Sequence, residues 1–395
     1  MKKLVILGGG AAGFLIAIRV MRSKISDIEV TLVDSKTFFE YTPALCSVLY
    51  EKSSEEFHRH FMNITFDYET VLKKLNVKFV PGKVKSLGEN QVYVSVKKDE
   101  LVSIDYDYLA ICTGSSYADP WKPNDITHNL NLEARMTYLN EQRQAYLNAK
   151  SILIIGGGPV GVESAAEIVY RSPQKLVTLV NSGSCVLASA PQELGKYAQK
   201  ILNSIDVKLI SNEKIEKKYK DSDVYVTDES KQEIIADLVY NCIGVKPNSE
   251  FLKESYQEWL DDKGYVQVEK TLNVKGKSNI FALGDINNLG EAKLYYTAHM
   301  QAMHFVRNLS RILNGQKMVP YQNAKPAMFI SMGPYYGVGT VSGIRFTGWP
   351  FTQDKGSKLA AWIKYIIEKI NVQGGGSIEI VINESLYMYS NLLPF

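Results

Sequence analysis

Apolar runs that end in glycines occur twice along this 395-residue chain. The first, "LVILGGGAAGFLIAI" at residues 4–18, starts as a short apolar strand and continues after its glycines with the spacing of a buried helix. The second, "SILIIGGGPVGVESAAEI" at residues 151–168, repeats strand, glycine turn and helix. A further apolar strand follows each, "IEVTLVD" at 28–34 and "KLVTLVNSG" at 175–183. Strands that alternate with helices predict an α/β fold with parallel sheets.

The glycine spacing within the first run is typical of a dinucleotide-binding turn. Gly8, Gly10 and Gly13 form G-x-G-x-x-G between the strand and the helix. Gly8 makes the tight turn, Gly10 lets the backbone approach a pyrophosphate, and Gly13 lets helix and strand pack closely. The next strand ends on Asp34, where an acid binds the hydroxyls of an adenosine ribose. We therefore predict a dinucleotide cradle here.

The second run has the same glycine spacing but a different strand end. Gly156, Gly158 and Gly161 repeat the pattern, whereas the following strand ends on Asn181. A carboxylate there would hold the ribose diol of NAD and repel the extra phosphate of NADP, and an asparagine does neither strongly. We expect the first cradle to hold a permanently bound dinucleotide and the second an exchanging NADH or NADPH.

The amino-terminal run also fits a competing interpretation, because Lys2 and Lys3 ahead of apolar residues resemble a secretory signal peptide. The ordered glycines, helix and terminal acid favour the dinucleotide cradle instead. No apolar run reaches the roughly 18 residues that span a bilayer, and Lys2 after Met1 is not the glycine that N-myristoylation requires. We expect neither a signal peptide nor a transmembrane helix.

Composition is that of an ordinary globular protein of two to three domains, with 22% charged and 45% hydrophobic residues. A net charge of +3 is too small to indicate nucleic acid. The cysteines form no C-x-x-C pair, which is typical of a reducing compartment and removes the dithiol of a disulfide reductase. They are Cys46, Cys112, Cys185 and Cys242. The histidines, such as His58 and His60, suggest no metal site.

Farther along, the pattern predicts how the domains are divided. A strand at 77–84 and two alternating strands at 91–98 and 101–116 read as a hairpin that returns to the main sheet. "ADPWKP" at 118–123 then leaves the first domain, and "GYVQVEKTLNVKGKSNIFALGD" returns to it, presenting Asp285 at a strand's carboxyl end. The domains we expect are a first dinucleotide-binding domain at 1–118 and 248–310, a second one for NADH or NADPH at 119–247, and a carboxyl-terminal α+β domain at 311–395.

A helix near the end has two interpretations. In "SKLAAWIKYIIEKINV" the apolar positions recur at helical spacing, while most charged positions lie elsewhere on the helix surface. The apolar positions are Leu359, Trp362, Ile363, Ile366, Ile367 and Ile370, and the charged ones Lys358, Lys364, Glu368 and Lys369. The apolar stripe packs on the protein's own core or a second copy, or the helix lies on a membrane surface.

Taken together these motifs resemble the two-dinucleotide-binding flavoproteins of the pyridine nucleotide-disulfide oxidoreductase superfamily, in which an NAD domain is inserted into a split FAD domain. Within them the chain is most similar to apoptosis-inducing-factor-like proteins of the mitochondrion-associated, ferroptosis-suppressing branch, and next to type II NADH:quinone oxidoreductases. The likeness runs through "LVILGGGAAG", "TGSSYADP", "GGGPVGVESAAEI", "NCIGVKPNS" and "MGPYYGVG".

The resemblance implies FAD in the first cradle and NADH or NADPH in the second. It implies that the ADP half of FAD lies on Gly8, Gly10, Ala11, Ala12, Gly13 and Asp34, with Val84 at the adenine, Thr113 and Gly114 at the crossing point and Asp285 at the ribityl chain. It implies that Gly156, Gly158 and Gly161 take the NAD(P)H pyrophosphate.

The resemblance also indicates residues near the reacting rings. Glu163 and Glu167, four apart on one helix face, follow its "GVE…AAE" pattern, and Glu163 is the candidate catalytic carboxylate. The competing role for Glu163 is to complement the helix dipole. The resemblance places Cys46 near the flavin, where relatives often carry a basic residue. The alternative role of Cys46 is that of a redox-active thiol, but no second cysteine lies at a spacing typical of a redox pair. Lys355 matches a lysine near the acceptor pocket of quinone-reducing relatives.

We expect an FAD-dependent oxidoreductase that passes electrons from NADH or NADPH to a quinone. "YTPAL" at 41–45 resembles a quinone-reductase turn, and Trp349, Phe351 and Trp362 offer an apolar mouth. The rival hypothesis is a redox-sensing flavoprotein with slow NADH oxidation, and a third is a ferredoxin or rubredoxin reductase, which the lack of a basic docking stretch disfavours. We expect a cytoplasmic protein, peripheral to a membrane such as the mitochondrial surface or a lipid droplet. The sequence leaves open whether it forms a homodimer.

Overall fold

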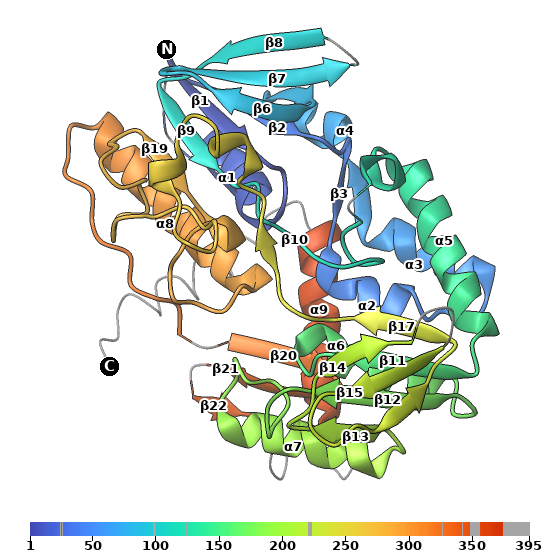
Figure 1. Cartoon of the computed structure of the whole chain (residues 1–395). Coiled ribbons are helices and arrows are strands. Elements are labelled where there is room, and N and C mark those ends of the chain that lie inside the picture. Colours follow the sequence, from blue (N-terminus) through green and yellow to red (C-terminus); the bar gives the residue numbers. More distant parts are fainter. Residues whose placement is uncertain are drawn as a thin grey trace.

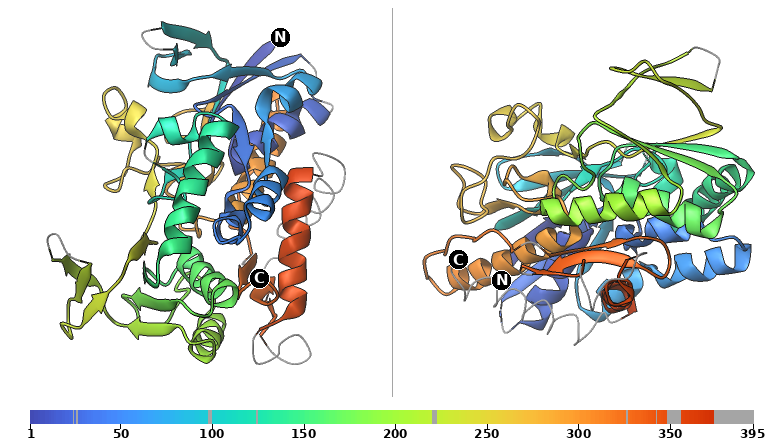
Figure 2. Two further views of the ribbon diagram at one scale, coloured as in Figure 1. Left: turned by 90° about the vertical axis from the view of Figure 1, so that its right-hand side faces the viewer. Right: turned by 90° about the horizontal axis from the view of Figure 1, so that it is seen from below.

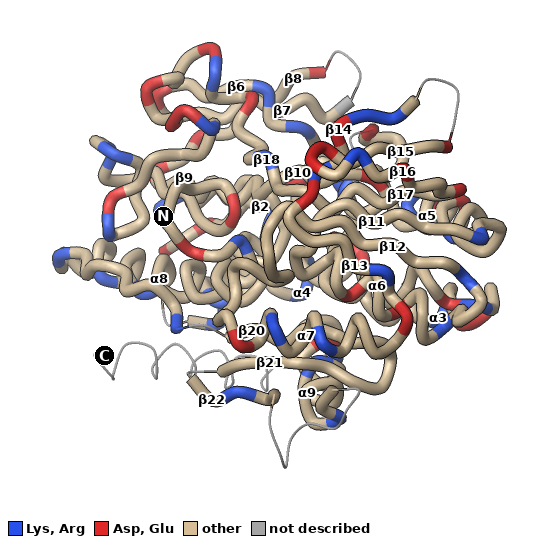
Figure 3. Tube along the Cα trace, turned by 60° about the horizontal axis from the view of Figure 1, so that its bottom comes forward, with Lys and Arg blue, Asp and Glu red and all other residues tan. Residues whose placement is uncertain are grey.

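The computed structural model describes residues 1–23, 25, 27–97, 100–123, 125–219, 223–325, 327–341, 343–347 and 356–373. Two lobes, each built on a parallel sheet, make up most of it (Figure 1). Acidic and basic residues are interspersed over most of the elements (Figure 3).

The first lobe is a five-stranded parallel sheet in the order β19-β9-β1-β2-β5. Its strands are β1 (Lys2–Leu7), β2 (Ile28–Asp34), β5 (Lys78–Pro81), β9 (Tyr108–Ile111) and β19 (Ile280–Ala282). Leu4 and Ile6 of β1 join the core that contains side chains of the helices α1 (Ala11–Arg22) and α8 (Tyr295–Leu313). Val5 and Leu7 point the other way, into the core beneath an antiparallel sheet. Both faces are covered, which explains why β1 is apolar almost throughout.

That antiparallel sheet and a group of short elements complete the first lobe. The sheet consists of β6 (Lys83–Leu87), β7 (Gln91–Lys97) and β8 (Glu100–Asp105). The short elements are β3 (Phe38–Glu40), β4 (Thr65–Asp67), α2 (Leu45–Val48), α3 (Ser54–Asn63) and α4 (Tyr68–Lys74), with 3₁₀ turns at Thr42–Ala44, Glu250–Leu252, Gln257–Trp259 and Gly284–Ile286.

Two details here differ from the predicted strands. The run at 77–84 is divided between β5 and β6, because the chain leaves the parallel sheet after Pro81 and passes β7 at Gly82, where a Cβ would lie 2.6 Å from Val94 Cγ1. The run at 101–116 is likewise broken, so that β8 stays in the antiparallel sheet while β9 enters the parallel one. Alternating hydrophobicity does not reveal this change of sheet.

The second lobe lies between β9 and β19 in sequence, although these two strands are neighbours in the first sheet. The chain crosses between the lobes through two short strands that pair with each other, β10 (Ser115–Ser116) and β18 (Lys246–Pro247). The second lobe is therefore an insertion into the first (Figure 1).

The inserted lobe repeats the parallel arrangement, in the order β13-β12-β11-β17. Its strands are β11 (Ser151–Ile155), β12 (Leu176–Asn181), β13 (Lys208–Ser211) and β17 (Leu238–Asn241), its helices α6 (Pro159–Arg171) and α7 (Gln192–Ser204), and its antiparallel strands β14 (Ile215–Lys218), β15 (Val224–Thr227) and β16 (Glu233–Ile235). The glycine turns of both lobes thus lie at the carboxyl ends of equivalent strands, β1 and β11.

The helix α5 (Leu132–Asn148), preceded by a 3₁₀ turn at Ile126–Asn129, leads into the inserted lobe but is held by residues of the first. Arg135 donates from Nε to Glu40 Oε2 at 2.7 Å and from Nη2 to Glu40 Oε1 at 3.2 Å, and both side chains are fully buried. Arg143 donates to the carbonyls of Glu51 and Lys52. Bidentate arginine pairing fixes α5 against β3.

The last described part is a small antiparallel sheet with one helix. It consists of β20 (Ala327–Ser331), β21 (Gly337–Val341), β22 (Ile344–Arg345) and α9 (Lys358–Gln373). The helix α9 packs on β20 and β21 and also contacts α3, so it runs along the outside of the molecule across parts of both lobes (Figure 2). Among the helices of the described chain, none combines the length and apolar character needed to cross a bilayer.

Candidate active site at the junction of two dinucleotide cradles

The first cradle has the geometry that its glycines predict. Gly8 has a φ of +97°, and a Cβ on it would lie 2.4 Å from the carbonyl oxygen of Cys112 on the neighbouring strand. A Cβ on Gly13 would lie 1.9 Å from the Gly8 carbonyl oxygen. By contrast, no described atom lies within 4 Å of a Cβ built on Gly10. The first two glycines are required by backbone contact, and the third leaves room above the helix start.

The second cradle reproduces these contacts almost atom for atom. A Cβ on Gly156, whose φ is +113°, would lie 2.6 Å from the Cys242 carbonyl oxygen. One on Gly161 would lie 2.0 Å from the Gly156 carbonyl oxygen, and around Gly158 no described atom comes within 4 Å. Equivalent backbone geometry at both sites indicates the same kind of ligand group.

The open space at each cradle fits a pyrophosphate. Among the described residues, no side chain caps the amino-terminal N–H groups of α1 or α6. The helices α3, α4 and α5, in contrast, have caps from Ser53, Asp67 and Asn131. Free N–H groups at the positive end of a helix bind phosphate oxygens. The residues present at both cradles therefore fit the pyrophosphate that FAD and NAD(P)H share.

The ends of β2 and β12 differ as the sequence suggests. Asp34 accepts the Gly9 N–H at 2.6 Å and the Lys36 N–H at 2.8 Å, which leaves lone pairs for ribose hydroxyls. Asn181 accepts the Gly157 N–H at 3.2 Å through Oδ1. Its Nδ2 donates to the carbonyls of Gly183 and Cys185, so both amide hydrogens are used. Asn181 brings neither charge nor a spare donor to the nucleotide.

The crossing between the lobes brings together three of the predicted cofactor residues. Gly114 has a φ of +64°, and Thr113 exchanges hydrogen bonds with Asn248, donating to its carbonyl and accepting from its side chain. Asp285 accepts a 2.7 Å hydrogen bond from Ser115 Oγ and remains part-exposed. These residues lie at the carboxyl ends of β9 and β19, where open α/β sheets bind ligands.

The other predicted cofactor residues are spread around this edge. Ala11 and Ala12 form the first turn of α1, and Val84 lies on β6. Cys46 lies on α2 and is buried against α6, where Ser164 Oγ approaches its sulfur at 3.8 Å. Burial, and then the negative charge of Glu163, raise the pKa of the Cys46 thiol well above its usual range. A buried neutral thiol is a poor nucleophile, which argues against a redox role.

Glu163 lies where α6, β20 and α9 meet. It lies near the start of α6, with its side chain buried, and accepts the Ser331 N–H at 3.0 Å. Its Oε1 also accepts a hydrogen bond from Lys364 of α9. Burial lowers the pKa of Lys364, but the charge and hydrogen bond of Glu163 outweigh that effect and raise it. Lys364 therefore carries its proton as an ammonium beside Glu163.

Lys364 is the residue that sequence reasoning missed. The helical pattern assigned Lys364 and Glu368 to the outer surface, yet only 15% of the Lys364 side chain and 13% of that of Glu368 are exposed. Trp362 and Tyr365 are the outward residues, 59% and 54% exposed. The prediction that Lys364 lies on the outer surface was wrong. Helical periodicity weighs the whole apolar stripe above any single charge, whereas in the folded protein the buried Glu163 needs a cation beside it. Lys355, Trp349 and Phe351 lie outside the described residues.

Glu167 shares the buried face of α6 with Glu163 but has other partners. Burial raises its pKa, against the opposing charge of Arg171, whose Nε donates to Glu167 Oε2 at 2.8 Å. Ser47 Oγ of α2 donates to its other oxygen at 3.3 Å. Both carboxylates are thus held by cations, Lys364 on one side and Arg171 on the other.

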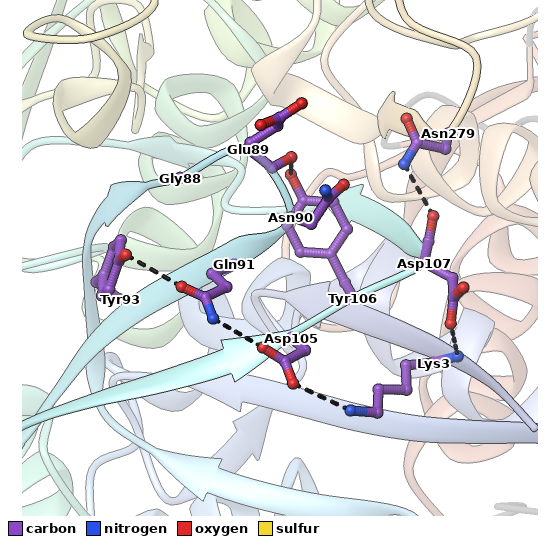
Figure 4. Close-up of a pocket in the computed structure, with 10 residues that line it drawn as sticks. All are labelled: Lys3, Gly88, Glu89, Asn90, Gln91, Tyr93, Asp105, Tyr106, Asp107 and Asn279. Atoms are coloured by element: carbon purple, nitrogen blue, oxygen red, sulfur yellow. Dashed lines mark hydrogen bonds and ion pairs between the residues drawn. The ribbon is translucent and has the colours of Figure 1, made fainter.

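A separate polar hollow of about 700 Å³ lies at the opposite edge of the first sheet. It is lined by Lys3, Asp105, Asp107 and Asn279, at the amino ends of β1, β9 and β19 (Figure 4). Asp105 bonds Lys3 Nζ, and Asp107 bonds the Lys3 backbone N–H. Because ligands bind at the carboxyl ends of parallel strands, this hollow is not part of the cofactor site.

Fold and site together define a flavoprotein with two dinucleotide cradles, one for FAD and one for NAD(P)H. The family model described as pyridine nucleotide-disulphide oxidoreductase matches residues 2–302. The chain belongs to this family, and it is an FAD-dependent NAD(P)H oxidoreductase. The expected fold of two Rossmann-like domains is confirmed.

Individual relatives agree with the resemblance read from the motifs. Oxidoreductase ptaL of Pestalotiopsis fici is 29% identical in an alignment that covers 88% of this chain and 94% of that protein. Ferroptosis suppressor protein 1 of Homo sapiens is 29% identical, with 86% of this chain and 88% of that protein covered. The structure of NDH2 from Plasmodium falciparum in complex with NADH has a TM-score of 0.72 and 13% identity, covering 98% of this chain and 97% of that one. The resemblance to the ferroptosis-suppressor branch is confirmed.

Proposed function

We propose that this enzyme passes electrons from NADH or NADPH to a quinone. The observation that supports this most directly is the buried Glu163–Lys364 pair where α6, β20 and α9 meet. Reduction of a quinone takes up protons as well as electrons. In this buried pair the Lys364 ammonium carries a proton and donates it in a hydrogen bond to Glu163. Relatives named ferroptosis suppressor protein 1 and NDH2 point the same way.

When bound, FAD supplies the ring that accepts hydride and passes electrons on. The protein's part is to bind, orient and exclude water. We propose that Gly8, Gly10, Ala11, Ala12, Gly13 and Asp34 hold its ADP half, with Val84, Thr113, Gly114, Asp285 and Cys46 along the rest, and that Gly156, Gly158 and Gly161 hold the NAD(P)H pyrophosphate. Glu163 keeps its carboxylate fixed by two donors, and Lys364 holds a proton on Nζ beside it.

We also propose that α9 brings the enzyme to a lipid surface, where long-chain quinones reside. Leu359, Trp362 and Tyr365 project from its outer side and are 37%, 59% and 54% exposed. Exposed aromatic side chains on one helix face are typical of interfacial helices. A peripheral position on a cytoplasmic membrane surface follows from this proposal.

Steady-state oxidation of NADH and NADPH by the FAD-loaded protein tests the function, with and without a short-chain ubiquinone. We expect quinone-dependent turnover that falls at least tenfold in Glu163→Gln, as for loss of an acid–base group. Glu133→Gln, an exposed change on α5, should leave turnover unchanged. Reduction by NADH without quinone-dependent turnover would refute the proposal and favour the redox-sensing flavoprotein.

A further inference from the structure

A polar cavity of about 330 Å³ lies between α3, α6, α9 and the turn after β20. Its rim includes Glu56, Arg59 and Tyr365, which are exposed. Its inner lining reaches Glu167, whose side chain is 1% exposed, and Lys364. The cavity therefore leads from solvent to the cation that holds Glu163.

His60 lies midway along this cavity, between two carboxylates from different elements. Its Nδ1 lies 2.9 Å from Glu51 Oε1, and its Nε2 lies 3.6 Å from Glu368 Oε1 of α9. Burial lowers the pKa of His60, but these two carboxylates outweigh it and raise the pKa to about 9. His60 thus carries its proton at neutral pH.

The remaining charges around the cavity are of both signs, and Arg171 pairs with two of the carboxylates. Arg171 donates to Glu51 Oε2 at 2.6 Å and to Glu167 Oε2 at 2.8 Å, and it has a raised pKa. Arg59 and Lys369 add positive charge at the lining and Glu56 adds negative charge. Because the two signs nearly cancel, the cavity selects neither an anion nor a cation as ligand. Its polar walls and volume suit several water molecules.

Reduction of a quinone to a quinol consumes two electrons and two protons. NAD(P)H supplies a hydride, which is two electrons and one proton, so that NAD(P)H + H⁺ + quinone gives NAD(P)⁺ + quinol. One proton per turnover must therefore reach the buried site from solvent. The receiving quinol oxygen is phenolic, with an ordinary pKa near that of tyrosine, about 10.

We propose that this cavity is the proton entry route, in which His60, held by Glu51 and Glu368, passes a proton through water to Lys364 and Glu163. The inference rests on the proposed quinone reduction. Lys364 Nζ gives its proton through Glu163 Oε1 to the quinol oxygen and regains one from cavity water, which His60 supplies and bulk solvent replaces. Donors whose pKa is near that of the receiving oxygen lose little driving force in the transfer.

His60→Gln and Glu368→Gln test the route, with Glu55→Gln, exposed on α3 and outside the cavity lining, as the matched control. Each FAD-loaded variant is assayed with a short-chain ubiquinone and with ferricyanide, which takes electrons without protons. We expect His60→Gln to lower quinone turnover about tenfold, more strongly as pH rises toward 9, and to leave ferricyanide reduction unchanged. Glu55→Gln should match the wild type with both acceptors.

A second readout does not depend on turnover. In an NMR titration of the FAD-loaded protein without NADH, the His60 resonances, identified by their loss in His60→Gln, should titrate near pH 9. In Glu368→Gln the midpoint should fall. Titration near the usual histidine value, or equal losses with quinone and ferricyanide, would overturn the entry route. A wild type that reduces ferricyanide but no quinone would overturn the proposed function itself, and quinone turnover unaffected by either variant would overturn the route alone.

Discussion

Replacing Lys364 by methionine leaves Glu163 as a buried carboxylate without its cation. Methionine keeps the unbranched, apolar stem of the side chain, so the packing of α9 on α6 changes little. Glu163 retains one donor, the Ser331 N–H at 3.0 Å. The variant therefore isolates the cost of an uncompensated charge.

Breaking a buried ion pair by removing one partner costs about 3–5 kcal/mol. The side chains of Lys364 and Glu163 are 15% and 8% exposed, so solvent still reaches the pair. We therefore expect a cost near the lower end of this range, about 3 kcal/mol. Since about 1.4 kcal/mol is a factor of ten, a loss of about 3 kcal/mol raises the equilibrium constant for opening of α9 roughly a hundredfold and lowers its protection by the same factor. The double variant Lys364→Met/Glu163→Gln removes the stranded charge and should lose less than the single variant.

Native-state hydrogen exchange of the α9 amides measures this loss directly, because α9 is the element that the pair fastens. Lys358→Met, an exposed change in the first turn of the same helix, is the control. Protection in Lys364→Met equal to that of Lys358→Met would refute the reasoning. So would single-variant losses that simply add in the double variant.

The pH dependence of the same pair has a definite sign. The folded-state pKa of Lys364 is raised, so its stabilisation is fully present below the ordinary lysine value of 10.5 and is lost as pH rises above it. The wild type should thus show no loss of α9 protection from this pair between about pH 6 and 9, both of which lie below the ordinary lysine value. In Lys364→Met, a carboxylate without its cation resists ionisation, and protection should fall as pH rises from about 4.

Three further predictions concern the cofactors and the lipid surface. Gly161→Ala places a Cβ 2.0 Å from a carbonyl oxygen, so KM for NADH should rise about tenfold or more while FAD stays bound. The equivalent variant of the first cradle, Gly13→Ala, should instead lose the absorbance of bound FAD. The reverse result would contradict the assignment of the cradles. Asn181→Asp should raise the ratio of NADH to NADPH specificity about tenfold, since it adds a charge facing the 2′-phosphate; unchanged ratios in steady-state kinetics would exclude Asn181 as a determinant. Trp362→Ser with Tyr365→Ser should reduce co-flotation with lipid vesicles, and flotation equal to that of the wild type would remove α9 from the lipid surface.

Local sequence patterns carried much of the fold. Strand, G-x-G-x-x-G turn and helix are consecutive in the chain, and Gly13 is needed for a contact within one such unit, whereas the contact that requires Gly8 is with Cys112 after β9. The return of the hairpin to the main sheet was predicted, but the breaks near Pro81 and between β8 and β9 were not, because they depend on which strands become neighbours. Roles at single cofactor residues, such as Val84 and Asp285, stay predictions.

The sequence by itself determined the two cradles, since each follows from residues close together in the chain. The expectation that one lobe is inserted in the other, and the choice of Glu163 as the candidate carboxylate, came from the resemblance to the family. Only the tertiary structure decided which cation meets Glu163. Lys364 lies some two hundred residues away on a helix whose apolar pattern indicated the opposite orientation. Helical periodicity ranks faces by the sum of their hydrophobicity, whereas a buried carboxylate needs one positive charge at hydrogen-bonding distance. That requirement arises only when α6, β20 and α9 have packed together and excluded water.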